Sequence, residues 1–159
     1  MRSRSPHLGI DALRPFFDKA HAARAGVFIV ARSSNPEGLA LQTARLPDGR
    51  TVAESLADSI SAYNRTVFES FRPVGAVIGA TAEATIAATL ARLPHSLFLA
   101  PGIGAQGASF AQPAEHFGAA RPQAGPAVSP GILSAGPSVA RLRAAILQHR
   151  EQALAALAV

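Results

Sequence analysis

Residues 97–109 read Leu-Phe-Leu-Ala-Pro-Gly-Ile-Gly-Ala-Gln-Gly-Ala-Ser, and this stretch decides how the chain is interpreted. Its apolar start, Leu97 to Ala100, predicts a buried strand that ends at Pro101. The loop that follows crowds three glycines around one amide side chain: Gly102, Gly104, Gly107 and Gln106. Glycines at a strand end let the backbone approach a ligand and direct several N–H groups at one anion. The stretch therefore indicates either a phosphate-binding loop or a tight turn that merely requires glycine.

Neither a dinucleotide nor a metal fits the pattern. No acidic residue follows on a second strand about 20 residues later, where a dinucleotide-binding fingerprint needs one for the ribose. The histidines lack metal-ligand spacing, and no Walker loop, Gly-x-Ser-x-Gly elbow or His-Glu-x-x-His motif occurs. We therefore expect neither a dinucleotide cofactor nor a metal site.

Composition sets the class of protein. The chain has 159 residues, of which 48% are hydrophobic and 16% charged, which suits one α/β domain with a real core. No apolar run approaches the roughly 18 residues that span a bilayer, and the basic N-terminus is not followed by a secretory apolar segment. The absence of cysteine excludes disulfides and thiolate metal sites and suits a cytoplasmic location.

The net charge of +5 does not predict a nucleic-acid partner. The arginines are scattered, Lys19 is the only lysine, and there is one tyrosine and no tryptophan to stack on bases. We expect the positive field to attract small anionic ligands instead.

Apolar runs and helical spacing alternate along the chain. Strands are expected at 27–31, 74–79, 97–100 and near 127–129, and helices at 11–24, 51–70, 83–92 and 138–158. Residues 109–125, rich in Ala, Pro, Gln and Gly, are expected to form an irregular loop segment. The alternation predicts parallel strands with right-handed crossovers, in a doubly wound sheet or a barrel. A complete eight-stranded barrel needs about 250 residues, so this chain is too short to close one alone.

Four motifs, in order, carry a family resemblance. The segment 5–15 contains Ser-Pro-His-Leu-Gly and Leu-Arg-Pro, residues 27–38 read Val-Phe-Ile-Val-Ala-Arg-Ser-Ser-Asn-Pro-Glu-Gly, and residues 74–81 read Val-Gly-Ala-Val-Ile-Gly-Ala-Thr. With Pro-Gly-Ile-Gly-Ala-Gln-Gly at 101–107, they resemble the mycobacterial-type subfamily of orotidine 5′-phosphate decarboxylase.

The resemblance implies a fold and a reaction. Residues 1–159 would form a single partial domain, the C-terminal half of a (β/α)8 TIM barrel, with about four parallel strands, flanking helices and the first three strands missing. The reaction would convert orotidine 5′-phosphate to UMP and CO2 without a cofactor.

The same resemblance implies a set of substrate-binding residues. Gln106 would bind the 5′-phosphate with the backbone around Gly104 and Gly107, Pro101 would lie against the pyrimidine, and Ser34 would hydrogen-bond the base. Without the resemblance, Ser34 would be interpreted as a turn or cap residue before Asn-Pro. Asn35 and Thr81 also follow expected strands, but no role is assigned to them.

Two departures from the family pattern concern catalysis. The family's Asp-x-Lys-x-x-Asp constellation, whose lysine protonates C6, is absent, and we expect Lys19 to be a solvated helix residue. No catalytic residue is therefore assigned in this chain. Pro130 stands where the family presents an arginine to the phosphate, so that contact is lost, and Arg121 is a candidate substitute.

Three functional hypotheses remain at this stage. The chain is a catalytically incompetent part of the decarboxylase, a non-enzymatic half-barrel that binds nucleotide phosphate or pairs with a polypeptide carrying the first strands, or a degenerate product without function. Because a half-barrel leaves edge strands and half of its inner core without partners, we expect self-association or such a partner.

Overall fold

The computed structural model describes residues 2–4, 6, 9–67, 72–79, 86–103 and 109–157. Its strands form one sheet: β1 Arg2–Arg4, β2 Val27–Arg32, β3 Val74–Ile78, β4 Phe98–Ala100 and β5 Ala124–Pro126. They pair in chain order, and every pairing is parallel. The expected parallel α/β architecture is confirmed. The short β1 comes before the expected strands, which begin at Val27.

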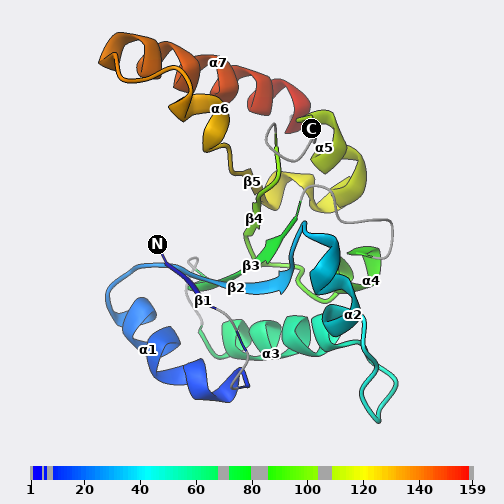
Figure 1. The fold of residues 1–159 in the computed structure, drawn as a ribbon. Helices are drawn as coiled ribbons and strands as arrows, with labels where there is room; N and C mark the ends of the chain where they lie inside the picture. The colour runs from blue at the N-terminus through cyan, green and yellow to red at the C-terminus, as the bar shows by residue number, and fades with distance from the viewer. Residues whose placement is uncertain are drawn as a thin grey trace.

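Helices lie between successive strands and after the last one. They are α1 Arg14–Ala22, α2 Leu39–Gln42, α3 Val52–Thr66, α4 Ala87–Ala91, α5 Ala111–Phe117, α6 Pro130–Leu133 and α7 Val139–Leu157. Short 3-10 turns add Asp11–Leu13 (η1), Pro36–Gly38 (η2) and Gly118–Gln123 (η4). Figure 1 shows α1 and α3 side by side along the sheet, whereas α6 and α7 extend beyond β5 at the other end.

The hydrophobic core lies between the sheet and its covering helices. Alternate strand residues such as Ile29, Ala76 and Phe98 point into it and are fully buried. Phe17 of α1 meets Tyr63 of α3 edge to face, with 5.1 Å between the ring centroids. This face of the sheet is therefore packed by the chain itself.

The opposite face of the sheet has less cover. Phe28 lies over Gly75, where an added Cβ would come within 2.7 Å of the phenylalanine ring. Leu97, which precedes β4, is 56% exposed, and Leu99 is half-buried. Such apolar exposure on a parallel sheet is unusual, because parallel sheets normally have both faces covered.

Polar side chains fix the ends of α3. At its start Thr51 and Glu54 form a capping box, in which the Thr51 N–H donates to Glu54 Oε2 at 2.7 Å and the Glu54 N–H donates to Thr51 Oγ1 at 3.1 Å. Near its end the buried Asn64 donates to the Val74 carbonyl (2.7 Å) and to Ser96 Oγ (3.1 Å), and it accepts from the Val74 N–H (3.2 Å). Asn64 thereby ties α3 to the start of β3.

Two expectations along the C-terminal third are wrong. The stretch 109–125, expected to be an irregular loop segment, contains α5, η4 and the first residues of β5. Pro113 does not prevent α5, because it lies in the first turn, where its missing N–H would have no helical partner. The last strand forms at Ala124–Pro126 rather than at 127–129. Helix α7 forms as expected, but none of its described residues is buried.

Candidate functional site

The carboxyl ends of the parallel strands lie at one edge of the sheet, where α/β proteins place their chemistry. Ser34 follows β2, Gly79 follows β3, and Pro101 follows β4. Ser34 and Pro101 are half-buried. The structure thus brings two of the expected substrate-binding residues to the same edge.

Ser34 and Gly79 approach each other closely. A Cβ added to Gly79 would lie 2.5 Å from the Ser34 nitrogen and 2.6 Å from its Cα. The Gly79 N–H donates to the Arg32 carbonyl at 2.9 Å, which extends the pairing of β2 and β3 to this point. Only glycine at position 79 therefore lets the two strand ends meet as they do.

The loop after β2 is organised by side-chain amides. Gln42, the last residue of α2, accepts from the Ser33 N–H at 3.1 Å and donates to Ser33 Oγ at 2.7 Å. At the exposed side of the loop, Asn35 Nδ2 donates to Glu37 Oε2 at 2.9 Å. That hydrogen bond lowers the pKa of the Glu37 carboxyl. The loop is thus a hydrogen-bonded turn whose carboxylate remains ionised at neutral pH.

The loop after β4 begins with a backbone conformation that favours glycine. Gly102 has φ of +107°, a value that L side chains rarely adopt. The next residue, Ile103, is buried against Phe110 and Val128. The turn therefore needs glycine at position 102, and Ile103 anchors the start of the loop. The expected phosphate-binding residues Gly104, Gln106 and Gly107, and also Thr81, lie outside the described residues.

Pro130 and Arg121 occupy different ends of the sheet. Pro130 is exposed and begins α6, shortly after the carboxyl end of β5. Arg121 lies in η4, which precedes the amino end of β5, and neighbouring Gln123 donates to the carbonyl of Pro94 on the loop before β4 at 2.8 Å. Arg121 is therefore at the opposite edge of the sheet, and the expectation that it replaces the phosphate-binding arginine is wrong.

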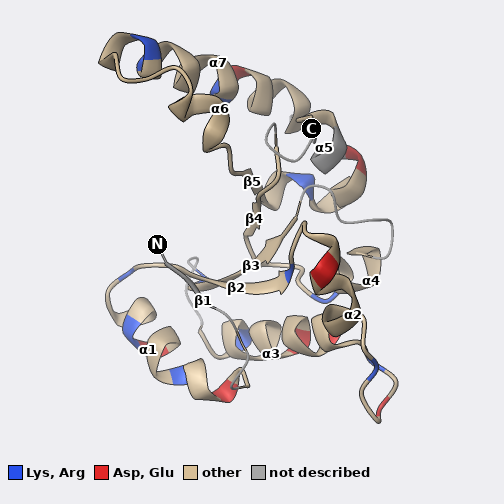
Figure 2. Cartoon of the chain, viewed as in Figure 1, with Lys and Arg blue, Asp and Glu red and all other residues tan. Residues whose placement is uncertain are grey.

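Charged residues are spread over the described part of the chain. Lys19 is exposed on α1, as expected for a solvated helix residue. Figure 2 shows acidic and basic residues interspersed along α1, α3 and the loop that precedes α3. Within the described part of the chain, no group of three histidine or acidic side chains could hold a metal ion.

None of the described helices is both long and apolar enough to cross a membrane.

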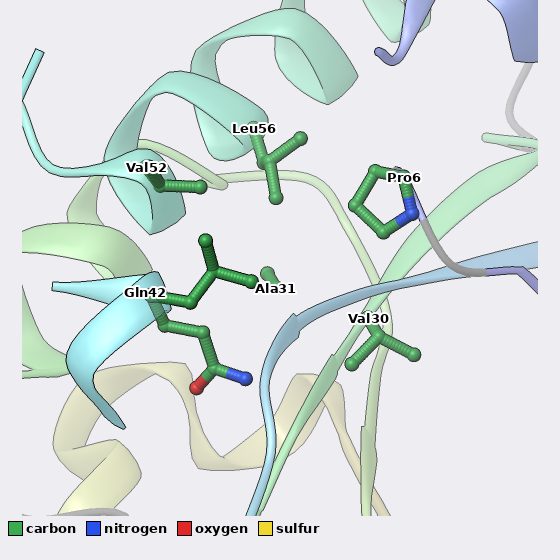
Figure 3. A pocket seen from close by; sticks show the side chains of 7 residues that line it. Pro6, Val30, Ala31, Gln42, Val52 and Leu56 are labelled. Atoms are coloured by element: carbon green, nitrogen blue, oxygen red, sulfur yellow. The ribbon is translucent and has the colours of Figure 1, made fainter. Parts of the chain in front are cut away.

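A cavity of about 290 Å³ lies beside the loop after β2. Its lining is mostly apolar and comes from β2, α2 and α3 and from Pro6: Pro6, Val30, Ala31, Leu41, Gln42, Val52 and Leu56 (Figure 3). Of these lining residues, Gln42 is the one with a side-chain amide.

Sequence reasoning missed the contributions of Gln42 and Gly79. Gly79 lies in the motif at residues 74–81. No local pattern indicates that the absence of a side chain there lets Ser34 come so close. Gln42 lies nine positions from Ser33 and carries no motif of its own, so only the folded loop reveals the pairing.

Known proteins support the resemblance drawn from the motifs, although no protein-family model matches the chain. An orotidine 5′-phosphate decarboxylase from Myxococcus xanthus is 44% identical over 144 residues, which are 90% of this chain and 50% of that protein. The decarboxylase from Salinispora arenicola is 50% identical over 89% of this chain and 50% of its own length.

Solved structures give the same result. A crystal structure described as an orotidine 5′-phosphate decarboxylase from Streptomyces avermitilis matches with a TM-score of 0.85 and 39% identity, covering 99% of this chain and 54% of that one. Leishmania donovani OMP decarboxylase matches with a TM-score of 0.76 and 29% identity, covering 99% and 57%. The chain spans about half the length of the curated relatives it matches. It is therefore a homologue of the orotidine 5′-phosphate decarboxylases that corresponds to about half of a TIM barrel, consistent with their C-terminal part.

Proposed function

We propose that this chain forms the substrate-binding half of an orotidine 5′-phosphate decarboxylase and does not catalyse decarboxylation alone. The observation that carries the proposal is that Ser34 and Pro101 both follow strands at the carboxyl edge of the sheet, in a chain whose one lysine, Lys19, is exposed on an outer helix. The substrate would be orotidine 5′-phosphate, and the product UMP.

The proposed residues divide the ligand between two loops. The Ser34 hydroxyl, which can both donate and accept, would hydrogen-bond the pyrimidine, and Pro101 would lie against the ring. Gln106 and the backbone around Gly104 and Gly107 would bind the 5′-phosphate through neutral N–H donors. No metal or organic cofactor enters this scheme.

The chemical step needs a group that these 159 residues do not place at the site. Loss of CO2 breaks the bond between C6 and its carboxylate and leaves an electron pair on C6, which a proton must capture. In the family, the lysine of Asp-x-Lys-x-x-Asp supplies that proton. Lys19 stands in Asp-Lys-Ala on α1, so it has neither the motif nor the position.

The less covered face of the sheet suggests what would complete the site. Leu97 is exposed there, and the edge strands β1 and β5 carry backbone groups that a further strand could pair. We propose that a polypeptide with the remaining strands covers this face in the cytoplasm, and that the chain self-associates without it.

The second candidate function is a nucleotide-phosphate-binding half-barrel without catalysis, and Pro130 argues against tight binding by it. A proline offers neither the charge nor the N–H of the family's arginine, so phosphate affinity would be weak.

Two measurements test these proposals. Decarboxylase activity is assayed with the chain alone and with the chain mixed with the remaining half of the Myxococcus xanthus relative. Activity only on mixing supports the split enzyme, whereas turnover by the chain alone contradicts it.

Calorimetric titration with UMP compares the wild-type chain with Gln106→Ala. Weaker binding by the variant supports the phosphate role of Gln106, and identical heats refute it.

A further inference from the structure

Gln42 holds the residue next to Ser34 by both of its polar groups. Its side-chain oxygen accepts from the Ser33 N–H at 3.1 Å, and its side-chain nitrogen donates to Ser33 Oγ at 2.7 Å. One amide therefore fixes the backbone and the hydroxyl of the same residue. We call this pair of hydrogen bonds the Ser33–Gln42 clamp.

The turn at Gly38 packs tightly against the clamp. A Cβ added to Gly38 would lie 2.5 Å from Ser33 Oγ and 2.8 Å from Gln42 Nε2, so the turn packs directly against both partners. On the other side, Ser34 contacts Gly79 at the end of β3. The Ser33–Ser34 backbone is thus held between α2 and β3.

The surroundings of the amide strengthen the clamp. The cavity beside it is lined by apolar groups such as Val52 and Leu56, and Figure 3 shows the Gln42 amide on the side of the cavity away from these two. The amide is half-buried, so its hydrogen bonds to Ser33 are partly shielded from water. Loss of the clamp would therefore let the loop move.

We propose that Gln42 is a positioning residue that sets where the Ser34 hydroxyl meets the pyrimidine base. This inference rests on the proposed function. It separates recognition of the base, which depends on the loop after β2, from recognition of the phosphate, which is assigned to the loop after β4. Gln42 does not touch the ligand in this scheme, so its effect is confined to the base.

The test compares the affinities of the full chain for UMP and for ribose 5-phosphate, which lacks the base. Gln42→Met removes the amide and keeps the side-chain length, and Gln42→Ala is a second variant should the first not fold. We expect each to weaken UMP binding about tenfold, the equivalent of one hydrogen bond, and to leave ribose 5-phosphate binding unchanged. Gln42→Glu should restore UMP affinity, because a carboxylate accepts from both the Ser33 N–H and its hydroxyl.

Thr43→Val is the matched control. Thr43 Oγ1 donates to the Leu39 carbonyl at 2.8 Å, so this variant loses a hydrogen bond beside the clamp without touching Ser33. Its UMP affinity should equal that of the wild-type chain. Equal weakening of both ligands by Gln42→Met, unchanged UMP affinity, or no rescue by Gln42→Glu overturns the positioning role.

Failure of the proposed function has a different signature. A wild-type chain that binds neither ligand overturns that function, and with it any role of Gln42 toward a base. Hydrogen exchange of the Ser33 amide tests the clamp itself without ligand. Exchange should quicken in Gln42→Met, and unchanged protection overturns the clamp whatever the titrations give.

Discussion

Replacement of Gly79 by alanine should disturb the candidate site from β3 without altering a polar group. The added Cβ would lie 2.5 Å from the Ser34 nitrogen, whereas ordinary contacts begin at 3.4 Å, so Ser34 or β3 must move by about 0.9 Å. The partner atoms belong to backbone, which cannot rotate away as the end of a long side chain can.

The cost follows from two effects. A shift of that size breaks the hydrogen bond from the Gly79 N–H to the Arg32 carbonyl, now 2.9 Å, at about 1 kcal/mol. Overpacking of the strand ends adds about 1–3 kcal/mol. Alanine recovers only about 0.5 kcal/mol by lowering the entropy of the unfolded chain. We therefore expect a net loss of about 1.5–3.5 kcal/mol in the free energy of unfolding.

Urea unfolding measures this loss, and Gly26→Ala is its control. A Cβ at Gly26 meets only the Pro73 carbonyl oxygen, at 3.9 Å, so we expect its free energy of unfolding to stay within about 0.5 kcal/mol of wild type. Gly79→Ala should also weaken UMP binding more than ribose 5-phosphate binding, because it displaces Ser34. If the two alanine variants have the same stability, the close approach of β2 and β3 is not a rigid feature and the reasoning fails.

Three further predictions concern side chains of α3 that tie this helix to the sheet or to neighbouring helices and loops. Asn64→Leu leaves the Val74 N–H and carbonyl without their side-chain partner and should lower the free energy of unfolding by about 2–4 kcal/mol. Urea unfolding should show a lower midpoint with an unchanged slope, and an unaltered midpoint would contradict the prediction. Burial and the hydrogen bond to Asp18 raise the pKa of Tyr63 to about 12, so its stabilisation is present below the ordinary value of about 10 and is lost as pH rises toward 12. Because Tyr63 is the only tyrosine, ultraviolet absorbance reports its ionisation directly, and a midpoint near pH 10 would refute this. Burial opposes ionisation of Asp58, but hydrogen bonds from two arginines outweigh it and lower the pKa of its carboxyl. Asp58→Asn should therefore cost about 0.5–1 kcal/mol near pH 7 and progressively less as pH falls below about 3.9, and an equal cost in acid would exclude this linkage.

Prediction from the sequence succeeded where the signal is local. The apolar runs at 27–31 and 74–79 become β2 and β3, since a strand buried on both faces needs little beyond apolar, β-branched residues. Prediction failed for 109–125, because alanine and proline there were interpreted as signs of irregular structure. A proline in the first turn of a helix does not oppose the helix. Arg121 failed for a different reason. Which end of the sheet a residue occupies depends on where β5 begins, and the boundaries of strands are the least predictable part of a sequence.

In the proposed function, the arrangement of the described residues separates binding from chemistry. The residues that set Ser34 in place, Gln42 and Gly79, both belong to this chain. The proposed base-binding loop would therefore not need the less covered face of the sheet to be completed. Protonation of C6 would need it, because the proton donor would come from strands that lie against this face. A chain built in this way can retain a ligand preference while lacking turnover, and base affinity and catalysis should respond independently to a polypeptide that covers the sheet.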